Sequence, residues 1–466
     1  MHKSKLSSAF LTLRDPLFWK TALPLALPIT LQNLLTSSFQ IVDTLMVGQL
    51  GDTVIAAVGI AGQVAFFINL LFYGISAGGA VFIAQFWGAG NHRGIRHVYG
   101  LMLSLTLPVI LIFIAACSLF STNLMAVFTD DAALIEIGAR YLRIACWSYL
   151  PVGLNQVFCI VLRSTEEVRL PMVTGIFSVI LNAAANYALI FGKFGLPALG
   201  VEGAAIATVL SAFLGTLLVF LISLSHRNML CASLREIFSF DRRFAGKYIH
   251  RSLPVLINEG LWSLGVLGYN MVFGRLGADN YAALTIFRTI ENLGFVFFIG
   301  ICNACAVLVG KNIGAGRIDE AKKVSGAFML LVPLAGITVG LLLVILSSPI
   351  LSLFNVSPYV RRTAHLLLYF YAADIGIRNI PYISVCGIFR AGGDTKIGVK
   401  YDIGCLYGFS LPLVILSAFV LQLPFLAVYI IMLLAEDLPK SFLCIRRFLT
   451  YTWIKPVTDS VSTLSE

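Results

Sequence analysis

Long apolar stretches, each broken by a few polar residues, follow one another along most of this chain. A membrane-spanning helix needs about 20 mostly apolar residues, and glycine and proline within the stretches fit helices better than the weak alternation of a membrane barrel. Twelve such blocks occur, at 21–48, 54–87, 97–121, 132–162, 169–192, 202–224, 248–274, 281–311, 323–347, 359–389, 397–421 and 424–445. The pattern therefore predicts an all-α polytopic membrane protein with twelve transmembrane helices.

The first block carries polar residues on one face. Gln32, Thr36, Gln40 and Asp43 are spaced i, i+4, i+8 and i+11, so they line one side of a helix. Asn33 lies beside them. A polar group without a partner in hydrocarbon costs several kcal/mol. This face must therefore border protein or a water-filled interior.

An internal repeat relates the two halves of the chain. At an offset of 226 residues, Pro28 matches Pro254, and Gly88-Ala89-Gly90 matches Gly314-Ala315-Gly316. Six helices per half return the chain to the same side of the membrane, so the repeats are parallel, which is a secondary-transporter layout. We expect an N-lobe at 1–225 with helices 1–6, a cytoplasmic linker at 226–247, and a C-lobe at 248–466 with helices 7–12.

Composition and charge fit a membrane protein rather than a nucleic-acid binder. The chain is 58% hydrophobic and only 12% charged, against about 25% charged residues in soluble proteins. Its net charge is +10. Twenty-five lysines and arginines fall on one side of the predicted helices, Arg163, Arg390 and Lys440 among them, and four on the other. By the positive-inside rule, we expect a multi-pass cell-membrane protein with both termini cytoplasmic, no removable signal peptide and no nucleic-acid partner.

Several motifs resemble multidrug and toxic compound extrusion (MATE) transporters. They are VDTLMVGQLG at 42–51, AQFWGAG at 84–90, LRS at 162–164, GVEGAAIAT at 200–208, GKNIGAG at 310–316, FRAGGDTK at 389–396 and the WIKPVT tail. The resemblance implies a monomeric secondary antiporter without a cofactor, which exports organic cations, drugs or amphipathic metabolites in exchange for H⁺ or Na⁺. Alternating access would expose a substrate site between the lobes.

Asp43 is the leading coupling carboxylate of the first half. Charges within membrane segments are costly and usually line transport pathways, and Asp43 matches the family's helix-1 aspartate. The alternative is that it caps a neighbouring helix or lies near the outer interface. Some family members carry an Asn-x-x-x-Asp pattern on helix 5, where this chain has Asn182 and Asn186. A site with two carboxylates is therefore not expected in the N-lobe.

Glu259 is the corresponding candidate on helix 7, where it follows Asn258 and shares a face with Ser263. Family members with an acidic residue on this helix use the C-lobe for cation binding. A carboxylate at this depth is either protonated or ionised beside a cation, and both states serve coupling. No metal site is fixed by the sequence, although Na⁺ near Glu259 fits, and the alternative role is a structural hydrogen bond.

Helices 8 and 10 add further charges. Arg288 and Glu291 are three residues apart, and Asp374 and Arg378 are four apart, so each pair can be a structural ion pair. Alternatively, Arg378 is the counter-ion of Glu259 or Glu291, which leaves a proton-exchanging site. The family's helix-10 aspartate aligns nearer Asn379 than Asp374, which departs from the family's Na⁺ ligand set.

Polar residues within the apolar blocks are candidates for lining the substrate cavity, and interhelical hydrogen bonds would explain them equally well. The cavity candidates are Gln32, Asn33, Thr36, Gln40, Gln63, Asn182, Asn186, Asn258, Ser263 and Asn303.

Two other functions would require different sequence features. A flippase for a lipid-linked precursor would favour a strongly cationic cavity and more than twelve helices, and the sequence shows neither. An intramembrane enzyme would need a constellation such as HExxH or paired aspartates on facing helices, and none of the six histidines forms one. We therefore expect a transporter rather than an enzyme.

Overall fold

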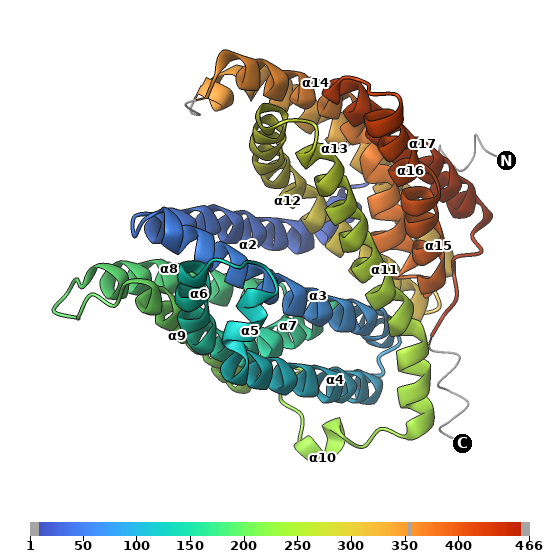
Figure 1. The fold of residues 1–466 in the computed structure, drawn as a ribbon. Coiled ribbons are helices and arrows are strands. Elements are labelled where there is room, and N and C mark those ends of the chain that lie inside the picture. The colour runs from blue at the N-terminus through green and yellow to red at the C-terminus, as the bar shows by residue number, and fades with distance from the viewer. Residues whose placement is uncertain (1–8, 353–355, 458–466) are drawn as a thin grey trace. The chain divides into compact units, whose positions relative to one another are not determined.

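The computed structural model describes residues 9–352 and 356–457, and its regular elements there are helices (Figure 1). The first half contains α2 (Pro16–Gly48), α3 (Asp52–Gly88), α4 (His92–Leu119), α5 (Ser121–Ala126), α6 (Ala132–Ala145), η1 (Cys146–Ser148), α7 (Tyr149–Ser164), α8 (Arg169–Phe191) and α9 (Gly200–His226). The second half contains α10 (Leu234–Ile237), α11 (Arg242–Gly274), α12 (Ala278–Gly314), α13 (Ile318–Ser352), α14 (Pro358–Tyr382), η2 (Ile383–Phe389), α15 (Thr395–Cys405), η3 (Leu406–Ser410), α16 (Leu411–Ile415), η4 (Leu416–Val420) and α17 (Phe425–Thr450).

These elements join end to end into the long helical segments that the apolar blocks predict. α6 runs through η1 into α7, α14 runs into the π-helical η2, and α15 continues through η3 and α16 to η4. In the part of the chain that the structure describes, nine spans are long and apolar enough to cross a membrane. The three long segments outside that set are α11, α14 with η2, and α17, which are the segments that carry Glu259, Arg378 and Lys440. The all-α polytopic fold class is confirmed.

Local chemistry explains where several helices begin and end. The Asp131 carboxylate accepts hydrogen bonds from the Ala133 and Leu134 amides and caps α6. Asn91 caps α4 in the same way, through the amide of Gly94. At its far end, α8 stops at Gly192, whose φ of 64° is left-handed and is readily adopted by glycine.

The described residues pack into two compact units. One contains residues 9–30, 84–90, 250–352 and 356–457, and the other contains 31–83 and 91–249. The predicted lobe boundaries at 225 and 248 stay a prediction. Helix α2 contributes to both units, because its first part packs in the unit with α11–α17 and its second part in the unit with α4–α9.

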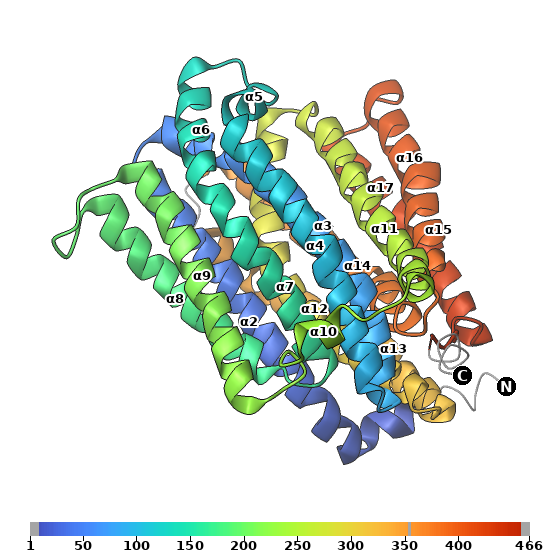
Figure 2. The same cartoon turned by 90° about the horizontal axis from the view of Figure 1, so that it is seen from below.

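The unit of residues 31–83 and 91–249 is held by close helix pairs and one aromatic-rich core. Helices α8 and α9 run side by side along their length (Figure 2), and the Ser178 hydroxyl donates to the Ser211 carbonyl between them at 2.9 Å. Ile68 and Phe72 of α3 pack against Ile110 of α4 in the buried core. Within the same unit, the second part of α2 contacts α8 through the hydrogen bond between Asp43 and Asn186.

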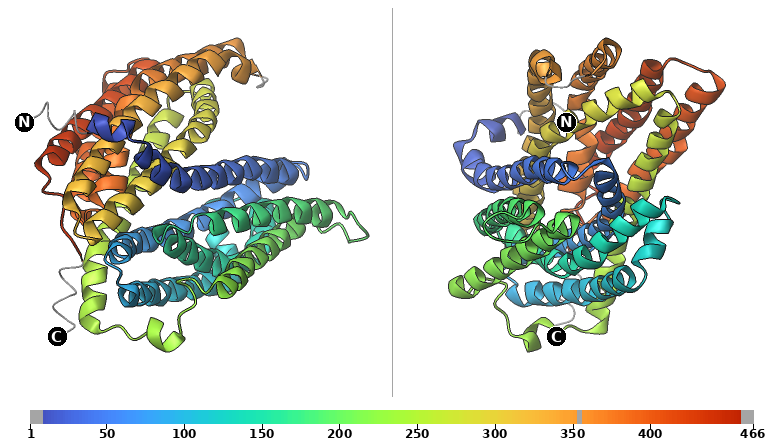
Figure 3. Two further views of the ribbon diagram at one scale, coloured as in Figure 1. Left: turned by 180° about the vertical axis from the view of Figure 1, so that it is seen from behind. Right: turned by 60° about the vertical axis from the view of Figure 1, so that its left-hand side comes forward.

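The other unit is built around α12, α13, α14 and α17. Helices α13 and α14 pack closely (orange in Figure 3), because Gly336 and Gly340 of α13 leave room for the backbone of α14 at Ile375 and Ala372. On another side of the unit, the Tyr407 hydroxyl donates to the Leu261 carbonyl at 2.8 Å and joins η3 to α11. Charged and polar side chains also connect α11, α14, α15 and α17 inside this unit.

Candidate functional site

Glu259 on α11 is paired with Arg390, the residue that follows η2. The arginine Nη2 lies 2.5 Å from the glutamate Oε1, and the side chains are 16% and 7% exposed for Glu259 and Arg390. By the positive-inside rule, Arg390 is expected on the inner side of the membrane. In the structure the Arg390 side chain is buried against Glu259 of α11. The predicted counter-ions of Glu259 did not include this residue.

A second charged group joins α11, α15 and α17. The Lys440 Nζ lies 2.6 Å from Asp402 Oδ1 and 3.8 Å from Glu436 Oε1. Asn258 donates to the other Asp402 oxygen at 2.9 Å, and the Tyr269 hydroxyl donates to Glu436 Oε2 at 3.0 Å. Asn258 was expected to line a cavity. In the structure, the Asn258 amide instead hydrogen-bonds the Asp402 carboxylate.

A third group surrounds Arg378 on α14. Its guanidinium lies 3.2 Å from Glu291 on α12 and 3.9 Å from Asp437 on α17. Asp374, one turn earlier on α14, interacts with the Asp437 carboxyl group and is 7% exposed. Of the alternatives left open by the sequence, the structure therefore supports Arg378 as the partner of Glu291, and it adds Asp437 as a second partner.

The other predicted pair is also rearranged. Arg288 donates to the Asn270 side chain on α11 and makes no ion pair with Glu291 in the described part of the chain. Asn379, the second candidate on α14, is 1% exposed and donates to the Ile375 carbonyl of its own helix at 2.8 Å. Each arginine therefore contacts residues on other helices: Arg378 contacts Glu291 and Asp437, and Arg288 contacts Asn270.

Taken together, these groups contain more acids than bases. Six carboxyl groups, on Glu259, Glu291, Asp374, Asp402, Glu436 and Asp437, accompany three bases, on Arg378, Arg390 and Lys440. Counting Arg288, one turn before Glu291, still leaves two carboxyl groups in excess. Burial of unpaired carboxylates is costly, so protons or cations must neutralise the excess.

Asp43 of the other unit faces an amide ladder rather than a base. Asn186 Nδ2 donates to Asp43 Oδ1 at 2.5 Å and contacts Asn182 Oδ1 at 3.2 Å, and Asn182 Nδ2 donates to Ser211 Oγ at 3.2 Å. The structure thus brings three predicted site residues together. An asparagine amide can donate to an ionised carboxylate and, turned over, can accept from a protonated one. Asn186 can therefore serve both protonation states of Asp43.

Gln32 on α2 has a specific distant partner. Its Oε1 accepts a hydrogen bond from Arg163 Nη2 of α7 at 2.7 Å. Like Arg390, Arg163 is expected on the inner side of the membrane, and the structure shows that its side chain contacts the first helix.

The remaining cavity candidates have local or exposed positions. Thr36 and Asn303 bond to carbonyls of their own helices, at Gln32 and Ile299, and Ser263 bonds to Gly260. Gln40 and Gln63 are exposed on the surface of their unit, and Asn33 is half-buried. Their place in a substrate cavity stays a prediction.

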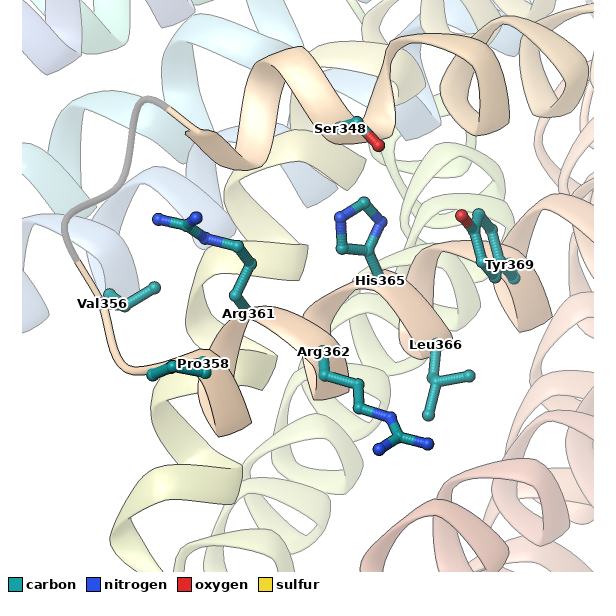
Figure 4. Close-up of a pocket in the computed structure, with 8 residues that line it drawn as sticks. All are labelled: Ser348, Val356, Pro358, Arg361, Arg362, His365, Leu366 and Tyr369. Carbon is teal, nitrogen blue, oxygen red and sulfur yellow. The ribbon is translucent and has the colours of Figure 1, made fainter.

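A separate recess lies where α13 ends and α14 begins (Figure 4). Its volume is about 470 Å³, and Arg361, His365 and Tyr369 of α14 supply its polar lining with Ser348 of α13. None of the predicted site residues lines it. Within residues 9–352 and 356–457, no group of three or more His, Cys, Asp or Glu side chains is arranged to hold a metal ion.

Comparison with known proteins identifies the family. The family model MatE matches residues 28–188 and 254–416, one match in each half of the chain. The chain belongs to the MATE family. It is therefore a membrane-spanning transporter and not an enzyme.

Relatives and solved structures agree with this assignment. A probable multidrug resistance protein NorM of Thermotoga maritima is 28% identical over 94% of this chain and 93% of its own length. A probable multidrug resistance protein YoeA of Bacillus subtilis is 26% identical over 89% and 90%. A crystal structure of a Vibrio cholerae MATE transporter superposes with a TM-score of 0.85 at 18% identity, covering 95% of this chain and 98% of that one. This last likeness shows the shared fold.

Five charged residues of this interior were not among the predicted site residues, and one of them, Arg390, directly follows the predicted block 359–389. The other four lie inside predicted blocks. Asp402 lies within the predicted block 397–421, and Glu436, Asp437 and Lys440 lie within the block 424–445. Ionisable residues inside predicted spans mark functional interiors, so that rule would have found them. Their mutual pairing needs the fold, because Asn258 and Asp402 are 144 residues apart.

Proposed function

We propose that this transporter is an H⁺-coupled antiporter that exports organic cations or amphipathic compounds by alternating access. It would lie in the cell membrane as a monomer, with both termini cytoplasmic. The N-lobe at 1–225, the linker at 226–247 and the C-lobe at 248–466 would follow the internal repeat. The substrate class is supported by the relatives NorM and YoeA, which are described as probable multidrug resistance proteins.

The single observation that carries proton coupling is how the buried carboxylates are partnered. Glu259 faces Arg390, Glu291 faces Arg378, and Asp402 faces Lys440. A Na⁺ site needs several oxygen ligands directed at one empty point, as other hard cations do, and the protein's own bases occupy these positions. The excess carboxyl groups then take protons, which add charge without needing a coordination shell.

Asp43 supplies a second exchange point in this proposal. Its carboxylate has an amide partner, Asn186, instead of a base. Protonation of Asp43 therefore removes its negative charge without depriving a basic side chain of its counter-ion. A proton on Asp43 and a cationic substrate would then be alternatives, because each neutralises the same carboxylate.

The experiment uses the full chain in proteoliposomes, with ethidium as the transported cation. A pH gradient and a Na⁺ gradient are imposed separately, each at the same membrane potential. We expect the pH gradient alone to drive ethidium movement, and a protonophore to abolish it. Movement that requires Na⁺ and ignores the pH gradient would overturn the proposal.

A further inference from the structure

The ammonium of Lys440 occupies a position that resembles a cation-binding site. It lies 2.6 Å from Asp402 Oδ1 and 3.8 Å from Glu436 Oε1. The side chains of Lys440, Asp402 and Glu436 are only 11%, 10% and 17% exposed. Glu436 and Lys440 are one turn apart on α17, whereas Asp402 comes from α15. The three groups are therefore fixed on two separate helices.

The surrounding groups are oxygen-rich. The Tyr269 hydroxyl contacts Glu436 and Ser410, the latter at 2.6 Å. Asn258 holds Asp402 through its amide nitrogen, while its Oδ1 is buried without a hydrogen-bond partner among the described residues. Carboxylate, hydroxyl and amide oxygens are the ligands that hard cations prefer. If the ammonium were removed, these oxygens would surround a site with two negative charges.

We propose that Lys440 is a tethered cation that keeps Na⁺ out of the Asp402–Glu436 site. The inference deepens the proton coupling proposed above, because it names the residue that excludes the competing ion. The ammonium lies between the two carboxyl groups and supplies a fixed positive charge where a bound cation would otherwise sit. The site therefore does not need a metal ion to balance the negative charge of its carboxylates. Lys440 is a specificity-determining residue in this proposal, and Asp402 is the group that it screens.

The prediction is that removing the ammonium creates Na⁺ binding. Purified full-length K440M is compared with wild type for ²²Na⁺ binding and for thermal unfolding in NaCl against choline chloride at equal ionic strength. A ligand that binds the folded state raises the unfolding temperature. We expect K440M to bind Na⁺ at least about tenfold more tightly than wild type, which corresponds to about 1.4 kcal/mol. K440R keeps the positive charge and should gain nothing.

Two further variants keep the test decisive. K440M/D402N removes the carboxylate and should lose the gained Na⁺ binding. E436Q/K440M removes one negative and one positive charge together, so it should fold if K440M alone does not, and should still bind Na⁺ more tightly than wild type. The proposal is overturned if neither K440M nor E436Q/K440M binds Na⁺ more tightly than wild type. Failure of the pH-gradient experiment would instead overturn proton coupling and would leave this binding measurement unchanged.

Discussion

Arg390 contacts Glu259 across 131 residues of sequence, and Arg163 contacts Gln32 across the same 131 residues. Glu259 lies 227 residues after Gln32, as Arg390 does after Arg163. The internal repeat therefore extends to a side-chain contact between the first helix of each half and an arginine at the end of its fourth segment. The sequence offset of 226 aligns Glu259 with Asn33, whereas the equivalent contacts in the structure align Glu259 with Gln32, the residue before it. The second half has a carboxylate where the first half has an amide, so only the second contact is an ion pair.

The Glu259–Arg390 pair should be required for coupled export. E259Q removes the carboxylate and leaves Arg390 with a neutral partner, so we expect ethidium export driven by a pH gradient to fall by more than about tenfold. Losing one partner of a buried pair also costs about 3–5 kcal/mol of stability. Transport in proteoliposomes and thermal unfolding in detergent measure the two effects separately.

The double variant E259Q/R390Q separates function from folding. Replacing both partners removes the unpaired charge, so its unfolding temperature should return toward that of wild type. Its transport should stay as low as that of E259Q. Wild-type rates in either variant would contradict the role assigned to Glu259.

Asp43 should be a second residue on which coupling depends. In D43N, Asn186 would face an amide that cannot ionise, so proton exchange at this position is lost while the side-chain volume is kept. We expect export to fall by more than about tenfold with little change in unfolding temperature. D319N is the matched control, because Asp319 is an exposed carboxylate that pairs with Lys322 on the surface. Equal transport in D43N and D319N would count against this role.

Gln85 should hold the C-terminal tail in place. This fully buried side chain donates to the Ala391 carbonyl and accepts from the Val457 amide, each at 2.8 Å. Q85L leaves both backbone groups unsatisfied, at about 1–3 kcal/mol each. Hydrogen–deuterium exchange should become faster at the amides of Lys455 and Val457. Q63L, at an exposed position of the same helix, should leave that exchange unchanged, and protection that survives in Q85L would contradict the prediction.

Gly88 should tolerate no side chain. A Cβ at this position would collide with the backbone carbonyl of Lys311 on α12, and one on Gly314 would collide with the carbonyl of Gln85. We expect G88A to lower stability by about 1–3 kcal/mol through overpacking. G62A on the same helix is the control. A Cβ there meets no described atom within 4 Å, so that variant should be as stable as wild type or more stable by about 0.5–1 kcal/mol. Equal unfolding temperatures of G88A and G62A would contradict the prediction.

The sequence by itself determined the helical membrane fold and the internal repeat, and it singled out Asp43 and Glu259 as candidate coupling residues. These features depend on local length, hydropathy and spacing, because about 20 apolar residues must span the hydrocarbon whatever their neighbours are. The association of Asp43 with Asn182 and Asn186 could have been predicted, because all three are polar residues inside apolar blocks.

Only the tertiary structure decided which charges meet. Arg390, Asp402 and Lys440 lie near the ends of predicted blocks or among residues assigned to the inner surface, and packing of α11, α15, η2 and α17 buries them together. The π-helical η2 changes the register of the chain before Arg390, which helical spacing cannot anticipate. An ion pair within one helix follows from residues three or four apart. A pair separated by 131 residues depends on how whole helices pack, and the low polarity of the interior makes that pairing obligatory.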